Sequence, residues 1–202
     1  MSAYVIGDIK VSDPDTYARY AAGVPASSGA YGCRYLVRGQ DRCEIAEGGW
    51  LPERLVLAEY QDMATVKAWY YSPEYTKLRE IRQSASTGNL IFAEGIDPEP
   101  VRDKEPEAGG YVIADIEITD MDTYATYRAG VPDTIAAHGG RFLVRGAEGE
   151  PTEGDWAPKR VVVIEFESLE RAKAWYHSPE YSELKKIRQS ASSGNVIFAA
   201  GI

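Results

Sequence analysis

The pattern of apolar and polar positions predicts a short series of strands and helices that occurs twice along the chain. In the second half, residues 111–118, 141–145, 160–166 and 195–199 are rich in Val, Ile and aromatic residues, which is typical of β-strands. Helices are predicted between them, over about 120–137, 168–176 and 179–194, the last with Ser178 as N-cap and Pro179 at its first position. The predicted order is therefore βαββαβ, with the last helical region in two pieces.

The first half of the chain follows the same order with closely similar residues. Tyr4-Val-Ile-Gly-Asp-Ile returns as Tyr111-Val-Ile-Ala-Asp-Ile, and residues 54–96 share 25 identities in 43 positions with residues 160–202. A period of about 106 residues is too long for a solenoid unit, so each copy is expected to be a small domain. We predict a first domain over 1–96, a charged linker rich in Pro and Gly over 97–110, and a second domain over 111–202.

Each copy is expected to form an α+β domain of the ferredoxin-like type, in which both helical regions cover one face of a four-stranded antiparallel sheet. Residues 160–166 are apolar at nearly every position, which indicates a sheet that is buried on both faces. The simplest cover for the second face is the sheet of the other copy. The two copies are therefore predicted to form a closed, or nearly closed, two-sheet barrel within one chain, with a polar hairpin loop of about a dozen residues in each copy.

Charge and composition narrow the range of partners. The net charge of −9 argues against nucleic acid or an anionic membrane surface, because both need clustered Lys and Arg. No apolar run reaches the length of a membrane span, and no signal peptide is visible, so a cytoplasmic location is expected. The two cysteines, Cys33 and Cys43, are expected to be reduced thiols, with a bridge between them as the less favoured alternative.

Several strings of residues resemble a known family. Tyr-Val-Ile-x-Asp-Ile, His138-Gly-Gly-Arg-Phe-Leu-Val-Arg-Gly and Ala174-Trp-Tyr-His-Ser-Pro-Glu-Tyr look like the domain of unknown function 1330 family (DUF1330), over essentially all of both copies. The resemblance implies the dimeric α+β barrel fold, usually formed by two chains and here by the tandem copies. It also implies a pocket between helices and sheet. Relatives in that superfamily include cofactor-free monooxygenases on aromatic polyketides, polyketide cyclases, muconolactone isomerase and haem-degrading enzymes.

Charged residues in mid-strand positions are the first candidates for chemistry. Alternation along strands places Arg141, Leu143 and Arg145 on one face, and Glu165 with Val161 and Val163 on another. Because a buried charge must be paired, we expect Asp115 to pair with Arg145, and Asp8 with Arg38 in the first copy. Such a pair either fixes the register of the sheet or is functional. In the functional interpretation Arg145 binds a substrate carboxylate or enolate, and Asp115 or Glu165 moves a proton.

The histidines differ between the copies. His138 and His177 both lie in the second copy, where the first has Tyr31 and Tyr71. Histidine exchanges protons near neutral pH, so the second copy is predicted to carry the better-equipped site and the first a degenerate one. The alternative is that both histidines lie at helix ends in solvent. We expect no metal site, since no further histidine lies near His177 and Glu180.

Aromatic residues are predicted to wall the cleft of each copy. These are Trp175, Tyr176, Tyr181 in the second copy and Trp69, Tyr70, Tyr75 in the first. Arg188, at the end of the last helix, is expected to close one end of the cleft. The alternative is that the rings form ordinary core and the arginine a helix C-terminal cation.

Two classes of function remain open. No Gly-x-Gly-x-x-Gly, Walker loop, Gly-x-Ser-x-Gly or zinc-ligand spacing is present, which argues against a nucleotide cofactor or a serine hydrolase. The first hypothesis is a cofactor-independent enzyme of cyclase, isomerase, lactone or monooxygenase type, acting on an aromatic or polyketide-like acid. Its candidate catalytic residues are His177, Arg145, Asp115 and Tyr176, and its candidate binding residues are Trp175, Tyr181, Arg188, His138 and Glu165, with Arg38, Asp8 and Tyr70 as first-copy equivalents. The alternative is a non-catalytic metabolite-binding or structural domain pair. A small molecule is the expected ligand of an enzyme or of a metabolite-binding protein, whereas a structural domain pair needs none. The fused barrel is also compatible with a homodimer.

Overall fold

A computed structural model describes residues 1–96 and 108–202. The expected linker falls largely outside the described residues. The first repeat contains β1 (Ala3–Val11), α1 (Pro14–Gly29), β2 (Arg34–Gln40), β3 (Cys43–Glu47), β4 (Arg54–Tyr60), α2 (Met63–Tyr70), α3 (Pro73–Ala85) and β5 (Ser86–Glu94). The second contains β6 (Gly110–Ile118), α4 (Met121–Ala137), β7 (Arg141–Ala147), β8 (Glu150–Glu153), β9 (Val161–Phe166), α5 (Leu169–Tyr176), α6 (Pro179–Ala191) and β10 (Ser192–Ala200).

The helices begin where the sequence places capping residues. The Asp120 carboxylate accepts hydrogen bonds from the backbone N–H groups of Asp122 and Thr123, both at 3.1 Å, which satisfies two donors at the start of α4. Ser178 caps α6 through the N–H of Tyr181 at 3.2 Å, directly before Pro179. The predicted break between α5 and α6 is therefore confirmed. None of the helices in the described ranges is both long and apolar enough to cross a membrane.

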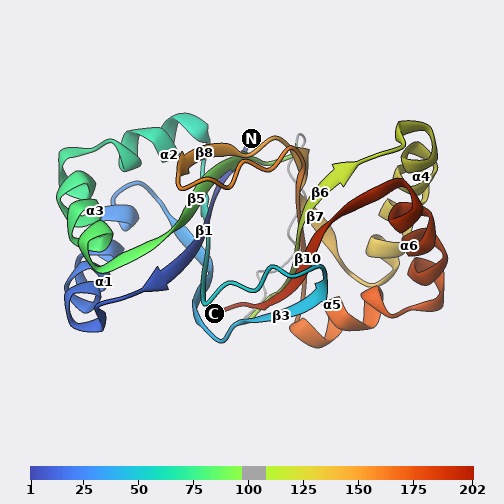
Figure 1. The fold of residues 1–202 in the computed structure, drawn as a ribbon, viewed down its shortest axis with the longest axis horizontal. Coiled ribbons are helices and arrows are strands. Elements are labelled where there is room, and N and C mark those ends of the chain that lie inside the picture. Colours follow the sequence, from blue (N-terminus) through green and yellow to red (C-terminus); the bar gives the residue numbers. More distant parts are fainter. Residues whose placement is uncertain (97–107) are drawn as a thin grey trace.

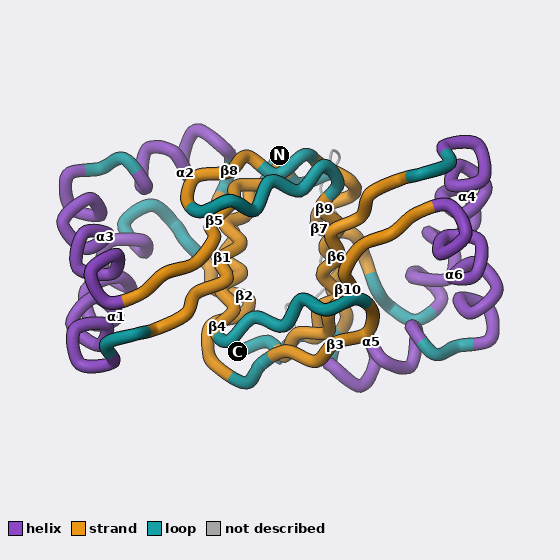
Figure 2. Tube along the Cα trace, in the orientation of Figure 1, coloured by secondary structure: helices purple, strands orange, loops and turns teal. Residues whose placement is uncertain are grey.

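Two antiparallel sheets face each other across the middle of the molecule, and the helices cover their outer faces (Figure 1, Figure 2). The strand orders are β2-β4-β1-β5-β8 and β3-β10-β6-β9-β7. Apolar side chains from both sheets form one continuous core between them. Its members include Tyr4, Ile6, Leu55, Leu57, Ile91, Tyr111, Ile113, Val161, Val163 and Ile197. The predicted α+β barrel, built within one chain from two ferredoxin-like repeats, is confirmed.

The fifth strand of each sheet comes from the other repeat. The sequence predicts only a polar hairpin loop in this region, but β8 pairs with β5 and β3 pairs with β10. Asn89 holds the crossing loop of the second repeat, since its side-chain oxygen accepts from the N–H groups of Asp155 and Trp156 at 3.0 Å each. Asn195 binds Gly49 and Trp50 in the same way. The two repeats therefore exchange edge strands reciprocally (Figure 1).

A β-bulge in each repeat changes which side chains share a face. In β7 the register shifts between Phe142 and Val144, and both Leu143 and Val144 belong to the core between the sheets. Arg145 therefore points to the helix side of the sheet, together with Phe142, over whose ring its guanidinium lies at 4.8 Å. Arg141 and Leu143 share the expected face, but the expectation is wrong for Arg145, since a regular alternation does not pass through a bulge.

Each exchanged strand delivers a carboxylate to an arginine of the other repeat. Glu153 on β8 accepts hydrogen bonds from Arg82, from the Tyr70 hydroxyl and, at 3.0 Å, from the Gln83 amide. The Arg82 and Glu153 side chains are only 4% and 13% exposed. Glu47 on β3 accepts from Arg188 and from the Tyr176 hydroxyl in the second repeat. The ion pairs thus join the repeats at both exchanged edges.

Glu153→Gln is expected to destabilise the protein by about 3 kcal/mol, because it leaves the buried Arg82 without its counter-charge. Burial is the largest single influence on the pKa of Glu153 and raises it, but the hydrogen bonds from Arg82, Tyr70 and Gln83 and the charge of Arg82 together outweigh burial, so the pKa lies below its usual value. The stabilisation is therefore present above the ordinary glutamate pKa of about 4.3 and is lost as the pH falls through the lower pKa of the folded state. Urea unfolding between pH 7 and pH 3 should show that the free energy of unfolding falls less steeply with decreasing pH in the variant than in the wild type.

Glu150→Gln on the same strand is the matched control. Glu150 pairs with Lys67, and the side chains are 47% and 42% exposed, so water screens the pair and stability should change little. Equal destabilisation by the two variants would show that the charge on β8, rather than the Arg82 pair, matters.

Candidate functional site

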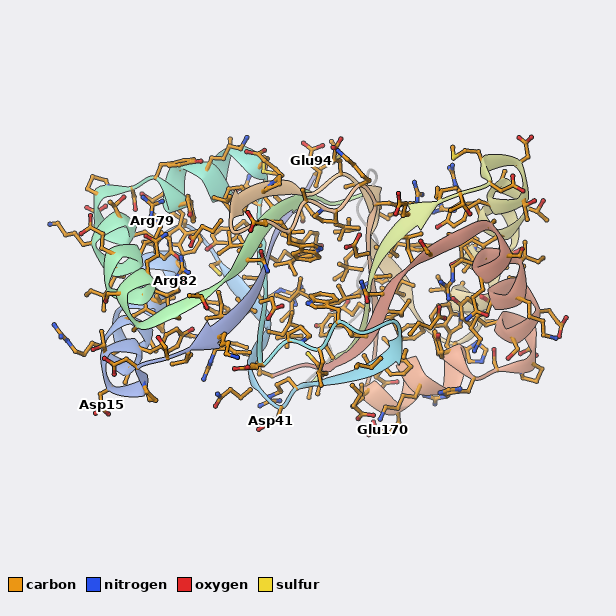
Figure 3. The ribbon with its side chains drawn as sticks, in the orientation of Figure 1. Asp15, Asp41, Arg79, Arg82, Glu94 and Glu170 are labelled. Atoms are coloured by element: carbon orange, nitrogen blue, oxygen red, sulfur yellow. The ribbon has the colours of Figure 1, made fainter. Side chains whose placement is uncertain are left out.

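A cavity of about 40 Å³ lies in the first repeat, between the sheet and helices α1, α2 and α3. This is room for a few water molecules. Its lining is aromatic and aliphatic apart from three arginines and the hydroxyl groups of five tyrosines. The polar or aromatic lining residues are Tyr17, Tyr20, Tyr35, Arg38, Arg54, Tyr60, Trp69, Tyr75 and Arg82. Figure 3 labels Arg82, which α3 contributes.

Strand β4 sets the length of the cleft. Arg54, Val56, Ala58 and Tyr60 alternate along this strand and all line the cavity. Arg54 and Tyr60 are six residues apart, so their backbones are separated by about 20 Å at the usual rise of a strand. The cleft therefore has an arginine end and a tyrosine end.

The arginine end favours an anion. The guanidinium of Arg54 lies over the Tyr17 ring at 5.2 Å and that of Arg82 over the Tyr20 ring at 5.8 Å. Among the described residues, the buried Nε atoms of Arg54 and Arg82 have no hydrogen-bond partner. No carboxylate is among the described residues that line the cavity. Glu153, which pairs with Arg82, is not one of the lining residues. Guanidinium N–H groups without a hydrogen-bond partner bind carboxylate, phenolate or enolate oxygens well.

The tyrosine end contains neutral donors. Ser28 donates to the Val24 carbonyl at 2.9 Å, so the Tyr35 hydroxyl, 3.1 Å away, donates to Ser28. Burial is the largest cause that raises the pKa of Tyr35 to about 12, and burial raises the pKa of Tyr60 far above its usual value. Both tyrosines therefore keep their protons at neutral pH. Burial also raises the pKa of the Cys33 thiol, more than hydrogen bonding to Tyr60 and Ser28 lowers it.

The second repeat lacks these polar groups. Phe142 and Phe166 stand where the first repeat has Tyr35 and Tyr60. Ile135 and Gly140 likewise replace Ser28 and Cys33. A Cβ atom on Gly140 would lie 2.3 Å from the Phe166 ring, so that ring fills the space where the first repeat holds a cysteine side chain. The cavity thus lies in the repeat that the histidine comparison predicts to be degenerate.

The predicted ion pairs between strands are wrong. The Asp115 carboxylate accepts from Trp156 Nε1 at 2.8 Å, and Asp8 accepts from Trp50 Nε1 at 2.9 Å, with the two indoles packed at 5.0 Å. Both tryptophans pack against the core between the sheets, on the opposite face from Arg145. The bulge is the cause, because it turns the arginine away from Asp115. Arg38 likewise stacks on Tyr35 at 4.6 Å instead of pairing with Asp8.

Glu165 also lies away from the helix–sheet cleft. It accepts from the Tyr111 hydroxyl at 3.1 Å and pairs with Arg141, on the face that the core between the sheets occupies. Glu59 repeats this arrangement with Tyr4 at 2.8 Å and Arg34 at 2.9 Å. These contacts join neighbouring strands within each sheet, and the residues do not line the cavity.

The histidines occupy helix ends. His138 is the C-cap of α4, with Nδ1 at 2.9 Å from the Thr134 carbonyl, and His177 is the exposed C-cap of α5. His177 packs against the Tyr176 and Phe198 rings. The described residues contain no group of three or more His, Cys, Asp or Glu side chains that could hold a metal.

The aromatic candidates form packed clusters. Trp175 and Tyr181 lie 4.0 Å apart between ring centroids, and Tyr176 and Arg188 share Glu47. In the first repeat Trp69 and Tyr75 are also 4.0 Å apart, and Tyr70 binds Glu153. The structure therefore gathers Trp175, Tyr176, Tyr181 and Arg188, with the exposed His177 against the Tyr176 ring, and separates them from Asp115 and Glu165. Their catalytic and binding roles stay predictions.

Sequence reasoning missed Arg54, Tyr35, Tyr60, Ser28 and Cys33 as site candidates. A signal was available, since Tyr35 and Tyr60 become phenylalanine in the other copy, which removes a hydroxyl while keeping the ring. The histidine differences drew attention instead, although they lie at the surface or at helix ends.

Comparisons with known proteins agree with this architecture. The chain belongs to the DUF1330 family, a domain of unknown function, whose model matches residues 2–96 and 109–202. The tandem duplication is thereby confirmed. No curated protein matches the chain.

Solved structures with the same fold are distant in sequence. A candidate monooxygenase from Lactobacillus acidophilus NCFM has 14% identity and a TM-score of 0.57, with 100% of this chain and 93% of that chain covered. A mutant chlorite dismutase from Candidatus Nitrospira defluvii has 9% identity and a TM-score of 0.54, with 100% and 91% covered. An anthrone oxidase-like protein has 9% identity and a TM-score of 0.50, again with 100% and 91% covered. At these identities the likeness establishes the dimeric α+β barrel fold.

Both cysteines are free thiols, and we expect them to react slowly with iodoacetamide at pH 7.5. Burial raises the pKa of Cys33 and raises that of Cys43 to about 12, so little reactive thiolate is present. Mass spectrometry should show slow labelling of the folded protein and rapid double labelling in urea. Fast labelling of Cys33 in the folded state would contradict the assignment of a protonated thiol.

Proposed function

We propose that the chain is a cofactor-independent enzyme that acts on an aromatic or polyketide-like acid, held as its anion in the helix–sheet cleft of the first repeat. The observation that carries this proposal is the cavity lined by Arg38, Arg54 and Arg82 and by aromatic rings, without a carboxylate. The histidines favour the second repeat, but the polar groups of the cavity favour the first.

An anionic ligand would satisfy groups that the protein itself leaves unpaired. A carboxylate, phenolate or enolate oxygen can accept from Arg54 Nε and Arg82 Nε, which lack partners among the described residues. The rings of Tyr17, Tyr20 and Trp69 offer flat apolar surfaces for an aromatic ligand. Because the cavity is small, a ligand of even one ring needs some of these side chains to move.

The lining is suited to stabilising negative charge on the ligand. Nearby guanidinium groups lower the pKa of a bound acidic O–H or of a C–H beside a carbonyl. Loss of that proton to solvent leaves an enolate whose oxygen the arginine and tyrosine donors hold. Such an enolate can take the proton back at another carbon, attack a carbonyl within the same molecule, or react with O₂. Isomerisation, cyclisation and oxygenation are thus the reaction types proposed.

The second candidate is a metabolite-binding protein that uses the same cleft without turnover. One observation favours it: within the described part of the chain, no histidine or carboxylate lines the cavity to act as a base, and burial raises the pKa values of Tyr17, Tyr35 and Tyr60. Binding and turnover must therefore be measured separately.

Arg54→Gln is expected to weaken binding of 2-naphthoate by about 10-fold to 100-fold, the value of a lost charge-assisted hydrogen bond. Binding of the neutral 2-naphthamide should change much less. Tryptophan fluorescence and calorimetry measure both affinities, and Trp69 lies in the cavity wall.

Arg160→Gln is the matched control, because Arg160 is the second-repeat counterpart and lies over Tyr124 at 5.4 Å as Arg54 lies over Tyr17. It should leave naphthoate affinity unchanged. An effect of Arg160→Gln alone would move the site to the second repeat, and no effect of either would overturn the proposal of an anion site.

Turnover is tested with 1,8-dihydroxyanthrone, an acidic ketone, incubated under air and under argon. We expect the protein to accelerate product formation above the protein-free rate, with at least a 10-fold loss in Arg54→Gln. Conversion to the anthraquinone and water that requires O₂ would assign oxygenation. Binding of the anthrone without any acceleration would favour the metabolite-binding alternative.

A further inference from the structure

Four polar side chains meet at the tyrosine end of the cleft, and only in the first repeat. They are Ser28, Cys33, Tyr35 and Tyr60, which we call the oxygen subsite. Ser28 and Tyr35 satisfy each other at 3.1 Å, with Ser28 bound in turn to the Val24 carbonyl. Tyr60 is only 1% exposed, and no nitrogen or oxygen atom of the described residues hydrogen-bonds to its hydroxyl. The polar group beside that hydroxyl is the Cys33 thiol, a weak hydrogen-bonding partner.

The Tyr60 hydroxyl is not needed for packing. Its ring stacks on Trp69 at 5.3 Å between centroids, and in the second repeat Phe166 stacks on Trp175 at 5.4 Å. The same architecture thus accepts phenylalanine with almost the same stacking on the tryptophan. A buried hydroxyl without a strong partner lowers stability, so its presence calls for an explanation other than packing.

Tyr60 also borders the right space. Tyr60 and Tyr35 both line the cavity whose other end holds Arg54. Since Tyr35 already donates to Ser28, the Tyr60 proton is the free donor at this end. A free, neutral donor in an apolar wall selects an acceptor oxygen on a ligand.

We infer that the oxygen subsite binds a carbonyl or hydroxyl oxygen of the ligand whose acid group the arginines hold. The inference rests on the proposed function, because it needs an acid at the arginine end. It deepens that function by naming the substrate class: an aromatic acid that carries a second oxygen, as a ketone or a phenol, at its far end. The second repeat, with Phe166 and Phe142, cannot make this selection.

The first test needs no ligand. Tyr60→Phe should keep or raise the melting temperature by a few degrees, because it removes a buried hydroxyl without a strong partner. The reverse change in the other repeat, Phe166→Tyr, should lower it, because the new hydroxyl meets the apolar surroundings of Gly140 and Ile135. A clear drop in melting temperature for Tyr60→Phe would show that the hydroxyl serves the fold, through the Cys33 thiol or a bound water, and would overturn the inference.

The second test compares 6-hydroxy-2-naphthoate with 2-naphthoate. The wild-type protein should bind the hydroxy acid about 10-fold more tightly. Tyr60→Phe should abolish this preference while leaving 2-naphthoate affinity unchanged. Phe166→Tyr, the control, should leave the preference as it is in the wild type.

The outcomes separate the two proposals. Equal binding of both acids, weakened by Arg54→Gln, would overturn the oxygen subsite and leave the anion site standing. A preference for the hydroxy acid that persists in Tyr60→Phe would also overturn it. Binding of neither acid at millimolar concentration would count against the anion site and, with it, against the subsite.

Discussion

The reciprocal exchange of edge strands is the constraint on which the rest of the molecule depends. Each helix–sheet unit contains an arginine buried at the base of its cleft, Arg82 or Arg188, and neither repeat supplies its main counter-charge. The carboxylates of Glu153 and Glu47 come from the opposite repeat on strands that pair only across the barrel. A buried guanidinium left without its partner would be strongly destabilising. The stability of each cleft therefore depends on the ion pair that the opposite repeat completes across the barrel.

The sequence predicts the repeat, the helices and the barrel because these follow from strong and local signals. Capped helix starts such as Ser178-Pro179 and apolar strands such as β9 are visible in the residues themselves. The exchanged strands are not visible, since Glu150-Pro-Thr-Glu is short and polar and becomes a strand only because β5 offers an open edge. The bulges in β2 and β7 are not visible in the pattern of apolar and polar residues either. They determine which face of the sheet the side chains of Arg38 and Arg145 occupy.

The candidate site is harder to predict because a sequence shows the type of each residue but not its burial. Histidines attract attention as proton carriers, yet His177 is exposed at a helix end and His138 is bonded to a backbone carbonyl. The informative differences between the repeats are single oxygen atoms at Tyr35 and Tyr60, which a sequence comparison scores as conservative changes. Their meaning depends on the three-dimensional fact that both tyrosines line the same cavity as Arg54.

Covalent fusion changes what a two-sheet barrel can become. When two identical chains associate, every substitution enters both halves at once, and both clefts must tolerate it. In a single chain with two copies, Phe166 can remove a hydroxyl from one half while Tyr60 keeps it in the other. The half that loses its polar groups still contributes Glu153 to its neighbour. Division of labour between scaffold and pocket is thus available to this molecule in a way that strict two-fold symmetry forbids.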